Sequence, residues 1–263
     1  MDFIFVNGHR LEVRQIAGSP CLAPLVFLHE GLGSVSLWTQ RGLDWPQALC
    51  QATGRTGVVF SRLGYGQSEP VAAGRNQLQP DYMHHQAWVV LPVLLGQLQI
   101  QSPVLVGHSD GATIALLHAS RFPVAGCVAM APHVLIEAVT LEAIAAAKVA
   151  FELSHALTGG LRGRLARHHA DVDGAFWQWS DVWLSEGFCS FDIRPDCSRI
   201  TAPLLLVQGL DDTYGTLLQL DEIARAAPHA QQLRLADCGH SPQHDQPDKT
   251  IAAIADFLIG KKL

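Results

Sequence analysis

The chain has 263 residues, a length that favours one large domain with room for an insertion. Hydrophobic residues make up 48% of it and charged residues 16%, which is typical of a globular protein and excludes a disordered chain. The formal net charge is -6, and the 18 Lys and Arg residues are scattered. This charge pattern argues against a nucleic-acid partner.

Targeting and metal signals are weak throughout the sequence. The first ten residues lack the apolar stretch of a signal peptide, and the longest mostly apolar run, 87–98, is too short to cross a bilayer. We therefore predict a cytoplasmic protein without membrane contact, as a monomer or a homodimer. The six cysteines form no CxxC pair, and the adjacent histidine pairs lack a third ligand, so we expect neither a disulfide framework nor a bound metal.

Short apolar strands alternate with longer helical stretches along most of the chain. The expected strands are 3–6, 11–16, 25–28, 58–60, 104–106, 127–130, 204–207 and 232–235. The expected helices are 37–52, 82–98, 112–121, 141–157, 217–227 and 249–258. Repeated strand-helix units predict an α/β fold in which a mostly parallel, eight-stranded sheet is flanked by helices on both faces.

The strand pattern stops after Pro132 for roughly 65 residues, which are Ala-rich and then rich in aromatic residues. We interpret residues 133–197 as a helical cap inserted into a core formed by 1–132 and 198–263. Two aromatic residues of the cap, Trp179 and Trp183, are candidate substrate contacts, although tryptophans serve more often as core packing.

The sharpest motif is Gly107-His108-Ser109-Asp110-Gly111, between an expected strand and an expected helix. It matches G-x-S-x-G in the strand-turn-helix context that exposes a nucleophilic serine. The glycines leave room for so tight a turn, and the helix N-terminus offers free N–H groups to a developing negative charge. The alternative is a structural turn in which Ser109 only caps the helix.

Partners for the serine follow in the chain order that this motif requires, first an acid and then a histidine. Asp212 lies on a turn just after the strand 204–207, and His240 follows the last strand on a glycine-containing loop, 28 residues later. The imidazole can take the serine proton, and the carboxylate can fix its tautomer. Asp211 is the alternative acid. We therefore predict a catalytic triad of Ser109, Asp212 and His240.

An oxyanion hole needs two backbone N–H groups aimed at the tetrahedral oxygen. One is expected from Asp110, the residue after the nucleophile, and the other from the loop after His29. In that loop Gly31 is the first candidate and Leu32 the alternative, and Leu32 is also a candidate substrate contact. The loop glycines alone are equally compatible with a plain turn.

Together these segments resemble the α/β-hydrolase family, through 29–34, 64–68, 107–111, 209–212 and 239–240. The resemblance covers the whole chain except the cap. It implies a triad with Asp212, a cap over the active site, a small-molecule substrate and no cofactor. It leaves the reaction open among esterases, thioesterases, lactonases, C–C bond hydrolases and lyases.

Two positions depart from the family pattern. Glu30 stands where the family has the glycine of His-Gly, which makes the first oxyanion donor less certain. The family's Asp and Arg before Gly-x-Gly are replaced by Ser61-Arg62-Leu63, so we expect the salt bridge of that loop to be absent.

The Ser-Asp-Gly elbow is similar to that of the valacyclovir-hydrolase group, in which the acid after the serine receives the substrate's amino group. This similarity gives the hypothesis that Asp110 favours cationic substrates, because a buried carboxylate gains most from a paired charge. The alternative is a helix N-terminal acid stabilised by the helix dipole.

The leading functional hypothesis is a serine hydrolase, carboxylesterase-like, that forms an acyl-enzyme on Ser109. The alternatives are a C–C bond hydrolase or lyase of the same fold, a thioesterase or lactonase, and a non-catalytic ligand-binding protein.

Overall fold

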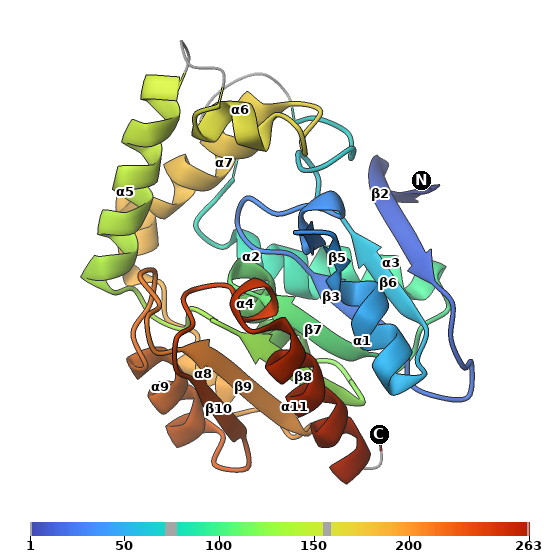
Figure 1. The fold of residues 1–263 in the computed structure, drawn as a ribbon. Coiled ribbons are helices and arrows are strands. Elements are labelled where there is room, and N and C mark those ends of the chain that lie inside the picture. Colours follow the sequence, from blue (N-terminus) through green and yellow to red (C-terminus); the bar gives the residue numbers. More distant parts are fainter. Residues whose placement is uncertain (1, 72–77, 155–158, 262) are drawn as a thin grey trace.

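The computed structural model describes residues 2–71, 78–154, 159–261 and 263. Its main sheet has eight strands in the order β1-β2-β6-β3-β7-β8-β9-β10 (Figure 1). The strands are β1 Asp2–Val6, β2 His9–Ile16, β3 Leu25–Leu28, β6 Gly57–Phe60, β7 Val104–His108, β8 Gly126–Met130, β9 Leu204–Gly209 and β10 Gln231–Leu235. Only β2 pairs antiparallel with its neighbours β1 and β6, so the predicted mostly parallel sheet is confirmed.

Helices cover both faces of this sheet. The helices that follow or connect its strands are α1 Trp45–Thr53, α2 Tyr82–His85, α3 Leu91–Gln97, α4 Asp110–Ala119, α9 Leu218–Ala226, α10 Pro242–Asp245 and α11 Pro247–Gly260. A five-residue π-helical segment, Gln86–Val90, joins α2 to α3 in place of the single helix expected over 82–98. Helices α1 and α11 lie side by side in front of the sheet in Figure 1.

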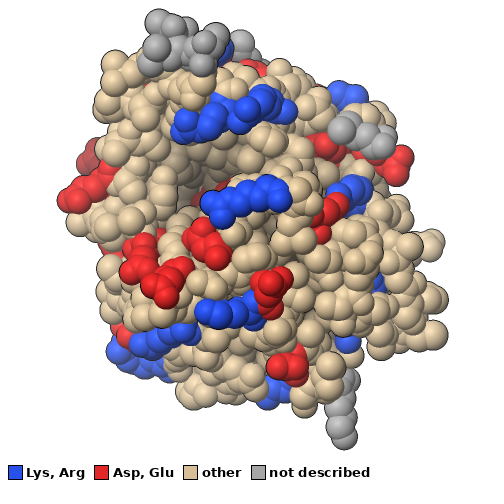
Figure 2. Space-filling view, in the orientation of Figure 1, with Lys and Arg blue, Asp and Glu red and all other residues tan. Residues whose placement is uncertain are grey.

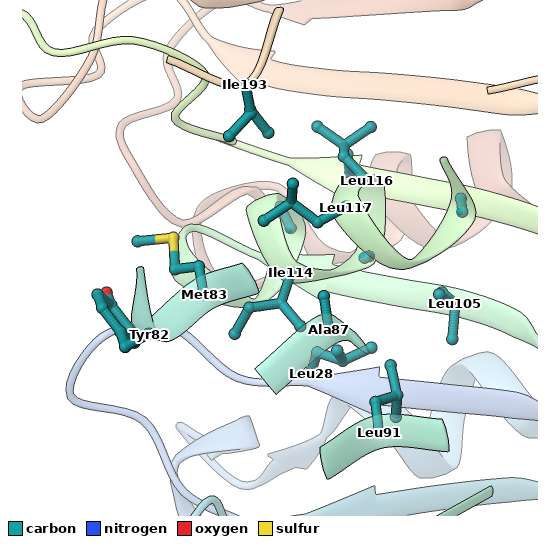
Figure 3. Packing of buried hydrophobic residues seen from close by; sticks show 14 of the residues in the cluster. Leu28, Tyr82, Met83, Ala87, Leu91, Leu105, Ile114, Leu116, Leu117 and Ile193 are labelled. Atoms are coloured by element: carbon teal, nitrogen blue, oxygen red, sulfur yellow. The ribbon is translucent and has the colours of Figure 1, made fainter. Parts of the chain in front are cut away.

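The central strands β3, β6, β7, β8 and β9 are buried at every position because both of their faces are covered, and most of their residues are apolar. In β7, Val104 and Val106 belong to the hydrophobic cluster beneath α1 and α11, whereas Leu105 belongs to the cluster that contains α3 and α4. Figure 3 shows the second cluster, where Ile114 of α4 packs between Leu28 and Met83. Helix α4 is therefore packed between strand β3 and helix α2.

The helix expected over 37–52 begins only at Trp45. Residues Thr39–Gln40 and Leu43–Asp44 instead form a small hairpin, whose turn places Arg41 at φ 50° and Gly42 at φ 80°. Asp44 then caps α1 by accepting a hydrogen bond from the Gln47 N–H at 3.1 Å. The sequence prediction was wrong here because the apolar spacing of 37–43 was interpreted as helical and the left-handed turn was overlooked.

Residues 133–197 contain α5 Ala138–Leu153, α6 Leu161–Leu165, α7 Val172–Trp183, α8 Arg194–Cys197 and a short 3-10 turn at Glu186–Ser190. The helix expected over 141–157 thus starts earlier, and positions 155–157 fall outside the described residues. Figure 1 shows α5, α6 and α7 grouped at the upper left of the molecule. The Ile193 N–H donates to the Val134 carbonyl at 2.9 Å, which joins the two ends of the segment.

All six cysteines are free thiols, and Cys21 and Cys189 are the exposed ones. Burial raises the pKa of Cys50 and Cys197 to about 12 each, which keeps these thiols protonated. No helix in the described part of the chain is long and apolar enough to cross a membrane. Figure 2 shows acidic and basic side chains interspersed on the visible face, without a continuous basic patch.

Candidate active site

The segment between β7 and α4 forms a strained turn that presents Ser109. This residue has φ 53° and ψ -119°, a conformation that residues with a Cβ rarely adopt. A Cβ at Gly107 would lie 2.3 Å from the Gly111 carbonyl oxygen, and one at Gly111 would lie 2.1 Å from the Leu28 carbonyl oxygen. Both glycines are therefore required by backbone contacts, as the motif predicted.

The structure brings the three predicted triad residues together. His240 Nε2 lies 2.9 Å from Ser109 Oγ, and His240 Nδ1 lies 2.9 Å from both carboxylate oxygens of Asp212. With a proton on Nδ1, the imidazole donates to the carboxylate and its Nε2 is free to accept the serine proton. Asp211, the alternative acid, is exposed on the same turn.

The Asp212 carboxylate is held ionised by its surroundings. Burial alone would raise its pKa, but the hydrogen bond and charge of His240 and the Tyr214 N–H, at 2.8 Å, together lower that pKa below its ordinary value. Gln208 Nε2 also donates to this carboxylate, at 3.2 Å. An ionised Asp212 can stabilise the imidazolium that forms when His240 accepts a proton.

A cavity of about 220 Å³ opens directly onto Ser109. Its walls include all the predicted substrate contacts, and most of its exposed lining is apolar. The lining residues are Glu30, Gly31, Leu32, His108, Ser109, Asp110, His133, Thr140, Ile144, Trp179, Trp183, Tyr214, His240 and Ser241. The site therefore combines loops after β3, β7, β8, β9 and β10 with α5 and α7 of the segment 133–197.

The two predicted oxyanion donors face this cavity. Asp110 is the first residue of α4, so its N–H has no acceptor within the helix. The structure assigns no hydrogen bond from the Gly31 N–H to any described residue, and the same holds for the Leu32 N–H, so the choice between the two loop donors stays open.

Segment 133–197 closes over the oxyanion loop through two side chains. A Cβ at Gly31 would lie 2.1 Å from Trp179 Nε1, so only glycine permits this approach of α7. His169 accepts a hydrogen bond from the Gly66 N–H and donates one to the Leu32 carbonyl, both at 3.0 Å. The sequence pattern gave no indication of this role for His169, one of the histidines first considered as metal ligands.

The Asp110 side chain lies buried in a hydrogen-bonded group. The Tyr82 hydroxyl donates to its carboxylate at 2.5 Å and accepts from Trp183 Nε1 at 3.1 Å. Arg62 Nη2 lies 4.0 Å from the same carboxylate. Burial raises the pKa of Asp110, against the opposing effects of Arg62 and Tyr82. Sequence reasoning missed Tyr82, which lies far from the elbow in the chain.

Arg62 corrects the expectation that a salt bridge is absent from its loop. Its buried guanidinium pairs with Asp110 and donates to the carbonyls of His29, at 2.6 Å, and Glu30, at 2.9 Å. These hydrogen bonds hold the backbone of the loop after β3. Arginine suits this role because its planar guanidinium has five donors.

The buried side chain of His108 and the partly exposed side chain of Glu30 form a second contact next to the triad. His108 Nε2 lies 2.7 Å from the His240 carbonyl oxygen, and His108 Nδ1 lies 3.4 Å from Glu30 Oε2. Gln243 Nε2 lies 3.0 Å from the same Nδ1. In the sequence, only the departure of Glu30 from the family glycine pointed to this contact.

Comparison with known proteins agrees with this architecture. The model of the alpha/beta hydrolase family matches residues 25–253. The chain is 25% identical to the sn-1-specific diacylglycerol lipase ABHD11 of Mus musculus, over 94% of this chain and 85% of the relative. Among solved structures it resembles the enol-lactonase from Burkholderia xenovorans LB400, with a TM-score of 0.73, 19% identity, and coverage of 98% of this chain and 100% of that one.

A second solved structure has a similar likeness. The meta-cleavage product hydrolase from Pseudomonas fluorescens IP01 gives a TM-score of 0.74 at 16% identity, over 99% of this chain and 98% of the other. Identities this low show a shared fold only. With a family match that spans most of its length, however, the chain belongs to the alpha/beta hydrolase family.

Proposed function

We propose that this protein is a serine hydrolase that cleaves a small or medium carboxylic ester through an acyl-enzyme on Ser109. The observation that carries the proposal is the hydrogen-bonded chain from Ser109 Oγ through His240 to Asp212. It starts at a serine held at positive φ on a turn that only flanking glycines allow. Hydrolase relatives in the same family support this assignment.

Acylation would begin when Ser109 Oγ attacks the ester carbonyl while His240 Nε2 takes its proton. The Gly31 and Asp110 N–H groups would stabilise the oxyanion of the tetrahedral intermediate. The imidazolium then gives its proton to the departing alcohol. In the second half of the reaction, His240 takes a proton from water, which attacks the acyl carbonyl. The imidazolium then returns this proton to Ser109 Oγ as the bond to the acyl carbon breaks, which releases the acid and the free serine.

We assign residues 133–197 as a cap that shapes the substrate site, on a core of 1–132 and 198–263. The apolar contacts would come from Leu32, Trp179 and Trp183. A cavity of about 220 Å³ is smaller than the ~300–1,000 Å³ of pockets for drug-sized ligands, which favours a compact acyl group.

The carboxylate of Asp110 already has Tyr82 and Arg62 as partners. This supports a structural role for Asp110 at the N-terminus of α4 over recognition of a substrate cation. We therefore propose that it fixes the cavity wall through Tyr82 and Trp183. Asp110→Asn should lower activity by the same factor on a neutral ester and on an amino-acid ester. A loss confined to the amino-acid ester would restore the cationic-substrate hypothesis.

The decisive experiment is a panel of short aryl esters, thioesters, lactones and a vinylogous C–C substrate, measured with the native protein and Ser109→Ala. We expect the esters to react fastest, the variant to lose all turnover above background, and a fluorophosphonate probe to label only the native protein. If the protein reacts fastest with a thioester, a lactone or the C–C substrate, it would be assigned to the corresponding class of hydrolase. Equal background rates without labelling would indicate a ligand-binding protein.

A further inference from the structure

Glu30 places an acidic side chain beside the residues that would stabilise negative charge. It immediately precedes Gly31, and its side chain lines the same cavity as Ser109. A carboxylate here opposes an oxyanion, because like charges repel strongly in a partly buried site. A functional oxyanion site therefore requires that the charge of Glu30 be neutralised.

The geometry of His108 supplies that neutralisation. Its Nε2 lies 2.7 Å from the His240 carbonyl oxygen, which can only accept, so Nε2 carries a proton. Its Nδ1 lies 3.4 Å from the ionised carboxylate of Glu30, which also can only accept, so that contact is favourable only when Nδ1 carries a proton too. An imidazole with both nitrogens protonated is a cation.

The orientation of the Gln243 side chain affects the protonation state assigned to His108. As placed, its Nε2 faces His108 Nδ1 at 3.0 Å, and its buried Oε1 has no hydrogen-bond partner among the described residues. The oxygen and nitrogen of a side-chain amide have nearly the same shape, so the opposite orientation fits the same space. With Oε1 toward Nδ1, the amide accepts from the imidazolium, as do the other two contacts.

We propose that Glu30 and His108 form a partly buried ion pair that positions His240 through its backbone carbonyl and cancels the acidic charge beside the oxyanion site. His108 and Glu30 are thus positioning residues for a reaction carried out by Ser109, and the inference rests on the proposed function. It also accounts for the exchange of the family glycine for Glu30, since each member of the pair makes the other tolerable in a buried place.

Several titratable groups surround the pair, and their charge states frame its pH dependence. Those that face Glu30 or His108 are His29, Arg62, His133, His168, His169, Asp212, His240 and His244. Burial lowers the pKa of His169 and of His244 to about 4 each, so both are neutral in the usual assay range. The Arg62 cation is engaged by backbone carbonyls and Asp110.

The pair predicts a loss of activity at high pH. Burial disfavours a charged His108, but the contact with Glu30 outweighs it and raises the pKa of His108 above its ordinary value. As pH rises through that pKa, His108 loses its charge and Glu30 remains uncompensated, so kcat should fall.

The test is a double-mutant cycle of Glu30→Gln and His108→Gln, with kcat and KM for an aryl ester from pH 5 to 10. His108→Gln leaves a bare carboxylate and should lower kcat by about tenfold or more, with a smaller change in KM. Glu30→Gln should cost less than about fivefold and should remove the high-pH fall. The double variant should recover to within about threefold of Glu30→Gln.

Additive losses in the cycle, or a high-pH fall that persists in Glu30→Gln, would overturn the ion pair. If His108→Gln fails to fold, the pH profiles of the native protein and Glu30→Gln decide the question alone. His118→Gln is the matched control, because His118 is a buried histidine outside the cavity lining whose side chain bonds the Ala87 carbonyl. Failure of the proposed function is distinguishable, since the native protein and Ser109→Ala would then show equal rates in the same assay.

Discussion

The loops at the carboxyl ends of the sheet strands and the helical segment 133–197 meet at one cavity but are held by different contacts. The elbow is fixed by backbone against backbone, with Gly107 and Gly111 approaching carbonyl oxygens that leave no room for a methyl group. The segment is fixed by side chains, chiefly Trp179 against Gly31 and His169 between two loops. Substitutions in the first region should therefore affect folding and kcat, and those in the second should affect KM and pH dependence.

The largest effect tests the triad on the sheet side. Asp212→Asn keeps the shape but removes the charge that orients His240, so kcat should fall by about 10⁴-fold, as for the corresponding change in other triads. The measurement is aryl-ester turnover, with urea unfolding as a check on the fold. A loss below about 100-fold would mean that Asp212 does not act with His240.

The next effect tests the backbone contacts of the elbow. Gly111→Ala forces a Cβ within 2.1 Å of the Leu28 carbonyl oxygen, so the free energy of unfolding should drop by about 4 kcal/mol or more. Gly96→Ala is the matched control, because its Cβ would meet no atom within 4 Å. Alanine at that helical position should raise the free energy of unfolding by about 0.5 kcal/mol. Equal urea midpoints for the two variants would show that the elbow can accept a side chain at Gly111 despite its close backbone contacts.

The third prediction concerns the two hydrogen bonds by which His169 joins the segment 133–197 to the core. Because Nδ1 accepts and Nε2 donates, the folded protein requires a neutral ring, and burial lowers its pKa to about 4. The unfolded chain takes up a proton below about pH 6.5, so stability is full above that pH and declines toward pH 4. The decline from this residue should reach about 3 kcal/mol.

Urea unfolding at pH 7, 6, 5 and 4.5 measures this slope, and His169→Gln should show a shallower one. A variant with the native slope would show that other groups, such as His133, whose pKa burial lowers to about 3, account for the acid sensitivity.

The smallest effect tests the cavity wall. Trp179→Phe removes the indole edge that lies against Gly31, so KM should rise by about threefold to tenfold while kcat changes less. Trp177→Phe, on the same helix but outside the cavity lining, is the control and should leave KM unchanged. A fall in kcat with constant KM would show that Trp179 positions the oxyanion loop and does not contribute to substrate binding.

The same contrast explains what the sequence could predict. The approximate positions of the eight strands along the chain and the placement of Ser109, Asp212 and His240 could be predicted, because glycine patterns and apolar runs reflect local backbone demands. The hairpin before Trp45 was missed, since Arg41 adopts a positive φ without a distinctive residue type.

The contacts of Tyr82, Arg62, His108 and His169 could not be predicted, because each joins residues far apart in the chain and depends on how α2, α7 and the loops pack. In the sequence, these contacts were indicated only by two departures from the family pattern, at Glu30 and at Arg62. Both residues interact with the oxyanion loop and its neighbours.

The distribution of thiols has a practical consequence for observing the two regions separately. Cys21 lies on the connection between β2 and β3, and Cys189 lies in the segment 133–197, while the other four thiols are buried. Maleimide dyes should therefore attach at one point on each region without any engineered cysteine. Energy transfer between such dyes would report, in the otherwise unaltered protein, whether the segment shifts against the core during turnover.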